Sequence, residues 1–173
     1  MTMRTFIFAA FLTGLLSPIA LEAQKKCKYD FDEQDPMTEV RVRRNKVKVK
    51  RFFLVNFYRK ADEFRVEVEI AMAGERNFVV PKGNELQLKL GNGTILRFPA
   101  AEDASPVSYV AGNQVATNFA ISHHCTRDQM ELLAAHGFRV VSTPIGDETY
   151  TLEIKEKKVS KNAQDAACML VDP

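Results

Sequence analysis

Residues 47–72 read VKVKRFFLVNFYRKADEFRVEVEIAM, and this stretch decides the fold. Apolar side chains recur at every second position on both sides of a polar break at residues 59–63. The alternating residues are Val47, Val49, Phe53, Val55 and Phe57 before the break, and Phe64, Val66, Val68, Ile70 and Met72 after it. Because successive side chains of a β-strand point to opposite faces, each run can bury one face. The break has the length of a hairpin loop, so the stretch predicts two long antiparallel strands.

The other faces of these two strands differ from each other. In the first strand Phe52, Leu54 and Tyr58 lie between the alternating residues, which predicts a central strand or one covered on both sides by a helix or a second sheet. In the second strand Glu67 and Glu69 hold the same positions, and we expect them to meet water.

Similar alternation continues through the rest of the chain. Leu86, Leu88 and Leu90 precede Asn92 and Gly93, a pair that supplies the positive φ angles of a tight hairpin. Further strands are predicted around residues 94–98, 107–110, 115–121, 138–142 and 150–154.

Two segments change from strand to helical periodicity. Thr126 and Gln129 have the spacing of a capping box, and Gly137 stands where a helix terminator belongs, so a helix is expected over residues 126–136. A second helix is expected over residues 157–170, with one apolar stripe formed by Val159, Ala163, Ala166, Ala167 and Leu170. The sequence therefore predicts an α+β fold with a largely antiparallel, hairpin-rich sheet of about eight strands and two helices.

Residues 1–23 have the pattern of a signal peptide. Arg4 precedes an apolar run over residues 6–16, and the small residue Ala23 stands before Gln24. The run is short for a membrane span, which needs about 20 residues, so a retained anchor is the weaker interpretation. We expect an exported protein, periplasmic or secreted, whose residues 24–173 form a single β-rich domain without a transmembrane span.

The sharpest charge feature is a basic segment in which seven of the eleven residues 41–51 are Lys or Arg. Its candidate ligand-binding residues are Arg41, Arg43, Arg44, Lys46, Lys48 and Lys50. A cationic stripe could bind a polyanion such as an anionic glycan or a lipid head group. Nucleic acid is disfavoured, because export separates the chain from it and no aromatic residues alternate with the bases. The alternative is a strand whose charges discourage aggregation or pair with the acidic segment before it.

The valines within this basic segment predict an irregular strand. The apolar positions change phase between Val42 and Val47. We therefore expect a turn or bulge near Asn45.

All three histidines lie close together in the sequence, at His123, His124 and His136, and Cys125 follows the first two. Zinc uses such ligands, so these four residues form a candidate metal site. Neighbouring residues of a strand point to opposite faces, so His123 and Cys125 could share an ion only if a further group folded back toward them, such as His136 beyond the helix.

The three cysteines allow one disulfide in an oxidising compartment. At about 100° per residue, Cys168 lies nearly opposite the apolar stripe of the last helix and is expected outside the core. The segment around Cys27 could cross that outer face, so Cys27 with Cys168 is the favoured pair. A link between Cys125 and Cys168, or a bond between two molecules, remains open.

No segment has the pattern of a catalytic or cofactor-binding motif such as G-x-S-x-G, C-x-x-C, H-E-x-x-H, a P-loop or a dinucleotide fingerprint. The sequence thus favours a non-catalytic exported protein without a cofactor, which binds an anionic component or a protein partner at the cell envelope or has a structural role there. The rival hypothesis is a small metal-dependent enzyme or hydrolase that uses His123, His124 and Cys125.

Overall fold

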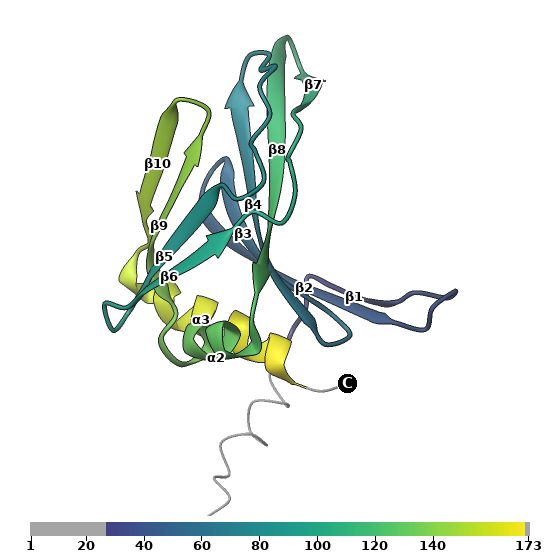
Figure 1. Ribbon diagram of the computed structural model, residues 1–173, viewed down its shortest axis with the longest axis vertical. Helices are drawn as coiled ribbons and strands as arrows, with labels where there is room; N and C mark the ends of the chain where they lie inside the picture. Colours follow the sequence, from purple (N-terminus) through teal and green to yellow (C-terminus); the bar gives the residue numbers. More distant parts are fainter. Residues whose placement is uncertain (1–26, 172–173) are drawn as a thin grey trace, which may run out of the picture.

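The computed structural model describes residues 27–171, so the expected signal peptide lies outside the described residues (Figure 1). The elements follow in the order β1 (Phe31–Gln34), β2 (Arg41–Lys50), β3 (Phe53–Lys60), β4 (Glu63–Ala73), β5 (Glu85–Leu90), β6 (Ile95–Pro99), β7 (Val107–Ala111), β8 (Gln114–Cys125), α2 (Arg127–His136), β9 (Phe138–Ile145), β10 (Glu148–Glu153), the 3-10 turn η1 (Glu156–Lys158) and α3 (Val159–Leu170). All strand pairings are antiparallel. The predicted α+β class with two helices is confirmed, and the described residues form ten strands in two sheets instead of about eight in one.

The larger sheet has the strand order β1-β2-β3-β4-β8-β7. Residues 47–72 form its centre, where Val55 lies opposite Val68 and Phe57 opposite Val66. These side chains are fully buried on the inner face. The predicted central position of β3 is confirmed, but its second face is not a second core, since Leu54 and Tyr58 are only half-buried there and Phe52, in the turn before the strand, is 56% exposed.

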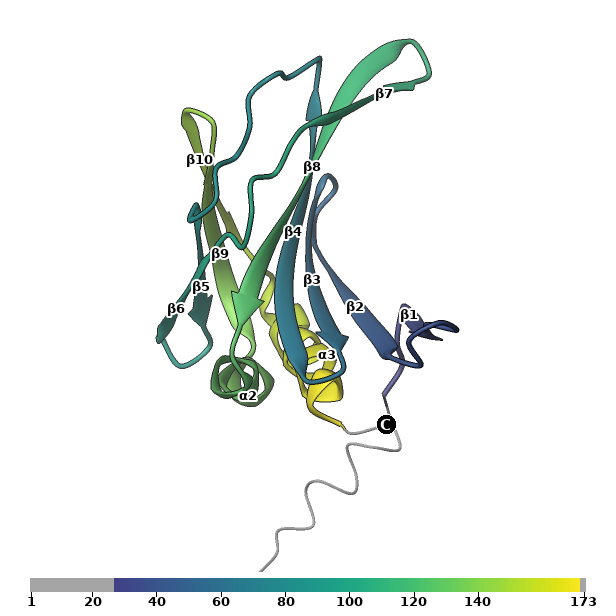
Figure 2. The same cartoon turned by 45° about the vertical axis from the view of Figure 1, so that its right-hand side comes forward.

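The smaller sheet has the order β10-β9-β5-β6 and faces the larger one across the core. The helices α2 and α3 lie at the lower end of the two sheets, and the sheets diverge toward the upper end (Figures 1 and 2). Phe57 of the larger sheet meets Phe138 of the smaller one edge to face, with ring centroids 6.2 Å apart. This contact links the two sheets at Phe138, whose backbone is bonded to Asn162 of α3.

Helix α2 begins and ends as predicted. The Thr126 hydroxyl accepts the backbone N–H of Gln129, and the Gln129 side chain accepts that of Thr126. Gly137, at φ +58°, follows the last turn.

Helix α3 matches the predicted stripe only in part, since Val159 and Ala166 are buried but Ala163, Ala167 and Leu170 are half-buried. Its buried residues are Val159, Asn162, Ala166, Cys168 and Met169. Asn162 points inward because its amide bonds the backbone of Phe138, with its Oδ1 accepting from the N–H and its Nδ2 donating to the C=O, both at 2.9 Å. The expectation that Cys168 lies outside the core is therefore wrong, and its exposed fraction is 2%.

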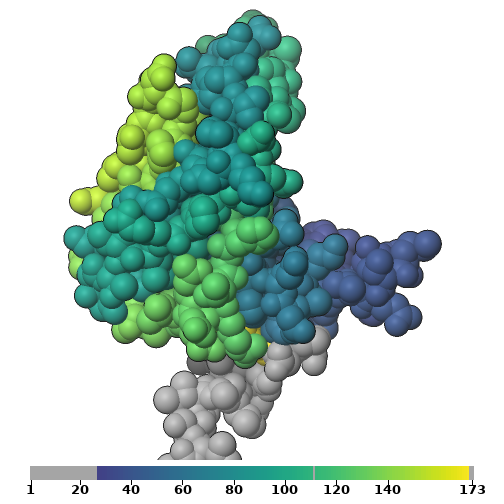
Figure 3. Space-filling view, viewed as in Figure 1, coloured from purple at the N-terminus to yellow at the C-terminus, as the bar shows by residue number. Residues whose placement is uncertain are grey.

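Strand β2 also corrects an expectation, because it continues without a turn or bulge at Asn45. Its register with β3 shifts between Lys48 and Lys50 instead. The valines change phase because the polar residues Arg43 and Asn45 occupy the inner face, where both are buried. At its other end β2 pairs with β1, and these strands with their connecting turn project from the rest of the molecule (Figure 3).

Candidate functional site

The acidic segment before β2 neutralises the first part of the basic strand. Asp32 lies opposite Arg43 in the β1–β2 pairing. Its carboxylate accepts two hydrogen bonds from Arg41, of 2.6 and 2.8 Å, and lies 3.6 Å from Arg43. The hydrogen bond from Arg41 lowers the pKa of Asp32, so the carboxylate stays charged at neutral pH. Arg41 is thus partly compensated within the protein.

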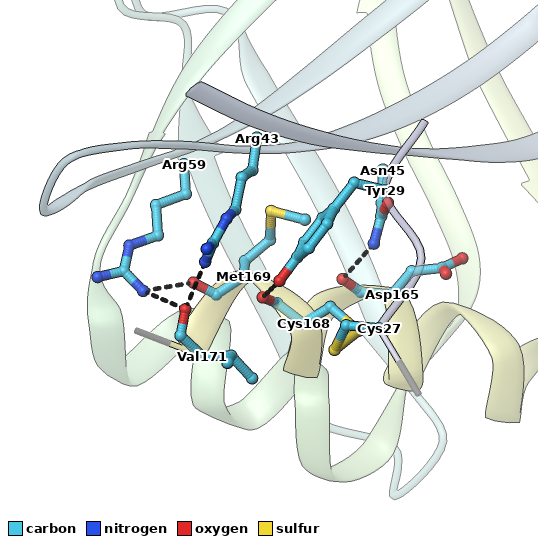
Figure 4. The surroundings of a disulfide bond; sticks show 9 residues. All are labelled: Cys27, Tyr29, Arg43, Asn45, Arg59, Asp165, Cys168, Met169 and Val171. Carbon is cyan, nitrogen blue, oxygen red and sulfur yellow. Dashed lines mark hydrogen bonds between the residues drawn. A yellow bond between two sulfur atoms is a disulfide. The ribbon is translucent and has the colours of Figure 1, made fainter. Parts of the chain in front are cut away.

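Arg43 has a structural role at the end of α3 (Figure 4). The last carbonyl groups of a helix have no partner within it and carry partial negative charge. Arg43 donates to the oxygen of Val171 at 2.7 Å, and Arg59 donates to the oxygens of Met169 and Val171 at 3.1 and 3.0 Å. Arg43 is 6% exposed, so its guanidinium serves the helix end rather than a ligand.

The disulfide lies in the same region and pairs Cys27 with Cys168, as the sequence favoured (Figure 4). Their Cα atoms are 5.5 Å apart across a sequence separation of 141 residues. The hydroxyl of Tyr29 donates to the oxygen of Cys168 at 3.0 Å, and Asn45 donates to that of Asp165 at 3.2 Å. The segment after Cys27 therefore crosses α3 and covers Cys168, which explains the burial of this cysteine.

Arg44 points to the other face of the sheet, among aromatic rings. Its guanidinium lies 5.7 Å from the ring centre of Phe31 and 5.8 Å from that of Tyr58, distances at which a cation is attracted to an aromatic face. Like Arg43, Arg44 is engaged by its neighbours.

The lysines of β2 have different surroundings from the arginines. Lys46, Lys48 and Lys50 are exposed, and none of them forms an ion pair within residues 27–171. Beyond the end of β1, the edge of β2 runs beside α3. There the oxygen of Lys48 accepts a hydrogen bond of 2.9 Å from Nζ of Lys158.

Two adjoining hollows lie where β2 meets α3. One has a volume of about 360 Å³ and is lined by residues that include Lys28, Lys46 and Lys161. The other, of about 120 Å³, is lined by residues that include Lys46, Lys48, Lys158 and Lys161. We call these five residues, Lys28, Lys46, Lys48, Lys158 and Lys161, the lysine groove.

The lysine groove contains two carboxylates against its five lysines. Asp30 accepts the backbone N–H of Lys46 at 2.7 Å, and Asp165 lines both hollows. Burial raises the pKa of Asp165, the charge of Lys161 opposes that shift, and Asp30 adds to it. The local excess of positive charge gives the groove the chemistry of an anion site. Lys28, Lys158 and Lys161 were missed from the sequence, although η1 and the first turn of α3 together carry three lysines.

The His and Cys residues do not form one cluster. His123 and Cys125 point into the core, whereas His124 is exposed on the opposite face of β8 and His136 ends α2. Within residues 27–171 no three His, Cys, Asp or Glu side chains gather as metal ligands. Sequence proximity alone thus brought these residues together as a candidate site.

The two buried members are chemically quiet. Burial lowers the pKa of His123 to about 4, and its Nδ1 donates to the oxygen of Val66 at 3.2 Å. Burial raises the pKa of the Cys125 thiol to about 12. A nucleophilic cysteine needs a thiolate, so this thiol is not activated at neutral pH.

A second polar cluster lies on the outer face of the larger sheet. Asn56 is fully buried there, and its Nδ2 donates to Glu67 at 3.1 Å and to Glu69 at 2.6 Å. Burial raises the pKa of Glu67. The two glutamates are half-buried, so they meet water, as expected from the sequence, only in part. The alternation identified their face but not the amide between them.

Comparison of the chain with known proteins gives no relative from which a function could be transferred. The chain matches no family model, no curated protein and no solved structure. Among residues 27–171, no helix has the length and apolar character that a membrane crossing requires.

Proposed function

We propose that this protein is exported, is not an enzyme, and binds an anionic component of the cell envelope through the lysine groove. The observation that carries the proposal is the division of the basic strand. Arg41, Arg43 and Arg44 are engaged by neighbouring groups. In contrast, Lys46 and Lys48 are exposed beside Lys158 of η1 and Lys161 of α3.

The chemistry of lysine sets the kind of ligand. A lysine ammonium is a compact, strongly hydrated charge on a flexible stem, which suits phosphate, sulfate or carboxylate groups that repeat along a polymer or a surface. Four of the five lysines of the groove are exposed, so solvent ions screen their charges within about 10 Å at 0.1 M salt. We therefore expect binding that is multivalent and weakens as salt rises.

Export is supported by two separate features. The Cys27–Cys168 disulfide fits an oxidising compartment, and residues 1–23 have the composition of a signal peptide. Envelope surfaces outside the cytoplasm carry anionic glycans and lipids, which are ligands of the proposed class.

The experiment compares two variants with equal loss of charge. In the first, Lys46, Lys48 and Lys161 are changed to Gln. In the matched control, Lys60→Gln, Lys82→Gln and Lys89→Gln remove three exposed lysines outside the groove. We expect the groove variant to elute from immobilised heparin at lower salt than the control. Equal elution of both variants and the wild type would refute the proposal.

A second arm identifies the source of the anion. The same proteins are sedimented with vesicles of neutral lipid and with vesicles that contain anionic lipid. A groove-dependent gain on anionic vesicles indicates lipid head groups, whereas groove-dependent binding to heparin alone indicates an anionic glycan.

A further inference from the structure

Strand β7 is an edge strand of the larger sheet, since within residues 27–171 it pairs with β8 alone. The β7–β8 hairpin reaches beyond the rest of the sheet at the end away from the helices (Figures 1 and 2). Val107, Tyr109 and Val110 are 64%, 45% and 74% exposed. An exposed edge of this kind can pair with another strand.

The other three edge strands carry features that discourage such pairing. Charged side chains and prolines on an edge protect a sheet from edge-to-edge association. They occur as Asp32 and Glu33 in β1, Arg97 and Pro99 in β6, and Glu148 and Glu153 in β10. Strand β7 has the sequence VSYVA and carries none of them.

The lack of charge extends well beyond β7. No Asp, Glu, Lys or Arg occurs between Asp103 and Arg127, although these residues make up 27% of the chain. The core does not require this, because Val107, Val110 and Val115 are exposed. The part of the sheet that is most exposed at its edge is therefore also the part without charge.

The hairpin geometry identifies the free main-chain groups of β7. The turn at Gly112, with φ +64°, closes on Ala111 and Gln114. Bonded and non-bonded pairs alternate along an antiparallel ladder, and a two-residue turn closes on a bonded pair. Tyr109 thus bonds to β8, and Ser108 and Val110 direct their N–H and C=O groups outward.

We propose that β7 pairs with β7 of a second copy of this chain, antiparallel about a two-fold axis at Tyr109. In this register Ser108 lies opposite Val110 of the second copy, so all of these outward groups find partners. No like charges meet across the axis, and the net charge of +2 opposes association only weakly. The two six-stranded sheets become one continuous sheet.

The oligomeric state of the purified protein tests this pairing. At about 0.1 mM protein, where weak contacts are populated, light scattering coupled to size exclusion should give the mass of a dimer. Val110→Lys should give a monomer, because it sets like charges near each other across the axis. The control Ile95→Lys places the same change on the edge strand β6 and should remain dimeric. A monomeric wild type, or a Val110→Lys variant as dimeric as the wild type, would overturn the proposal.

Cysteine cross-linking tests the register. With the axis at Tyr109, the two Tyr109 Cα atoms lie about 4.5 Å apart, within the range of a disulfide. The two Val110 Cα atoms lie about 8 to 9 Å apart, beyond that range. Tyr109→Cys should therefore form a disulfide-linked dimer under mild oxidation, and Val110→Cys should not. Equal cross-linking, or none in Tyr109→Cys, contradicts the two-fold pairing. The lysine-groove variants should leave the dimer unchanged.

Discussion

The guanidinium of Arg43 donates a hydrogen bond of 2.7 Å to the backbone oxygen of Val171, which joins the basic strand to the residue that follows the last helix. The same guanidinium lies 4.9 Å from the ring centre of Tyr29. Arg43 thus contacts both the end of α3 and Tyr29 in the segment that follows Cys27.

Replacing Arg43 should reduce stability rather than ligand binding. Arg43→Gln removes a charge-assisted hydrogen bond and the contact with Tyr29, so we expect a loss of about 2 to 3 kcal/mol. Urea unfolding measures this loss. The control Lys50→Gln changes an exposed residue of the same strand and should stay within about 0.5 kcal/mol of the wild type. Equal stability of both variants would contradict the structural role of Arg43.

Reducing the disulfide should destabilise the protein without unfolding its sheets. Cys27 and Cys168 close a loop across a separation of 141 residues, which corresponds to about 4 to 5 kcal/mol in the chain-entropy model. We expect a clear fall in the urea midpoint of the wild type with a reductant and none for Cys27→Ser with Cys168→Ser. A reductant effect of the same size in the double variant would show that another bond is responsible.

The contact between Asn162 and Phe138 should be one of the least replaceable in the molecule. Asn162→Leu removes the hydrogen-bond partners of both the N–H and the C=O of Phe138. Phe138 is fully buried. Each buried polar group left unpaired costs about 1 to 3 kcal/mol, so we expect a loss of about 2 to 6 kcal/mol for the two groups. Asn162→Asp keeps the acceptor for the Phe138 N–H, but it buries a charge and sets a second acceptor against the Phe138 C=O, so it should cost at least as much at neutral pH. Thermal unfolding of both variants measures these losses, and a loss below about 1 kcal/mol in either variant would contradict the role of the two bonds.

His123 should make stability depend on pH. Its pKa is about 4 in the folded state and about 6.5 in the unfolded chain, so the unfolded chain binds the proton more readily. Stability should therefore fall as the pH drops from about 6.5 to about 4, by about 3 kcal/mol for this residue. His123→Gln should lack this part of the pH dependence, and the exposed control His124→Gln should retain it. Identical pH profiles of free energy from urea unfolding would contradict this account.

The sequence predicted the elements that local periodicity determines. The hairpin of residues 47–72 and the cap of α2 follow from side-chain alternation and from residue types that lie close together in the chain. The two-sheet arrangement could not be predicted in this way, because β4 lies beside β8 through contacts between distant segments.

The remaining misses share a physical cause, which is polar residues in buried positions. Arg43 and Asn45 face inward because backbone oxygens in and just after α3 accept their hydrogen bonds. Asn162 faces inward because the backbone oxygen of Phe138 accepts a hydrogen bond from its amide. An argument from periodicity treats such residues as exposed. It therefore predicted the irregularity of β2 at the wrong residue and the buried face of α3 at the wrong angle. It also treated the basic segment as one unit, whereas tertiary contacts divide it.

This division of the basic segment is tested most directly by two double variants of the same strand. The lysine variant combines Lys46→Gln with Lys48→Gln, and the arginine variant combines Arg41→Gln with Arg44→Gln. Both variants remove the same charge from β2. The measurement is the salt concentration at which each folded protein elutes from immobilised heparin. We predict a clearly lower value for the lysine variant and nearly the wild-type value for the arginine variant, because Arg41 and Arg44 are already engaged within the protein. An equal fall in both variants, or a fall in the arginine variant alone, would contradict the account.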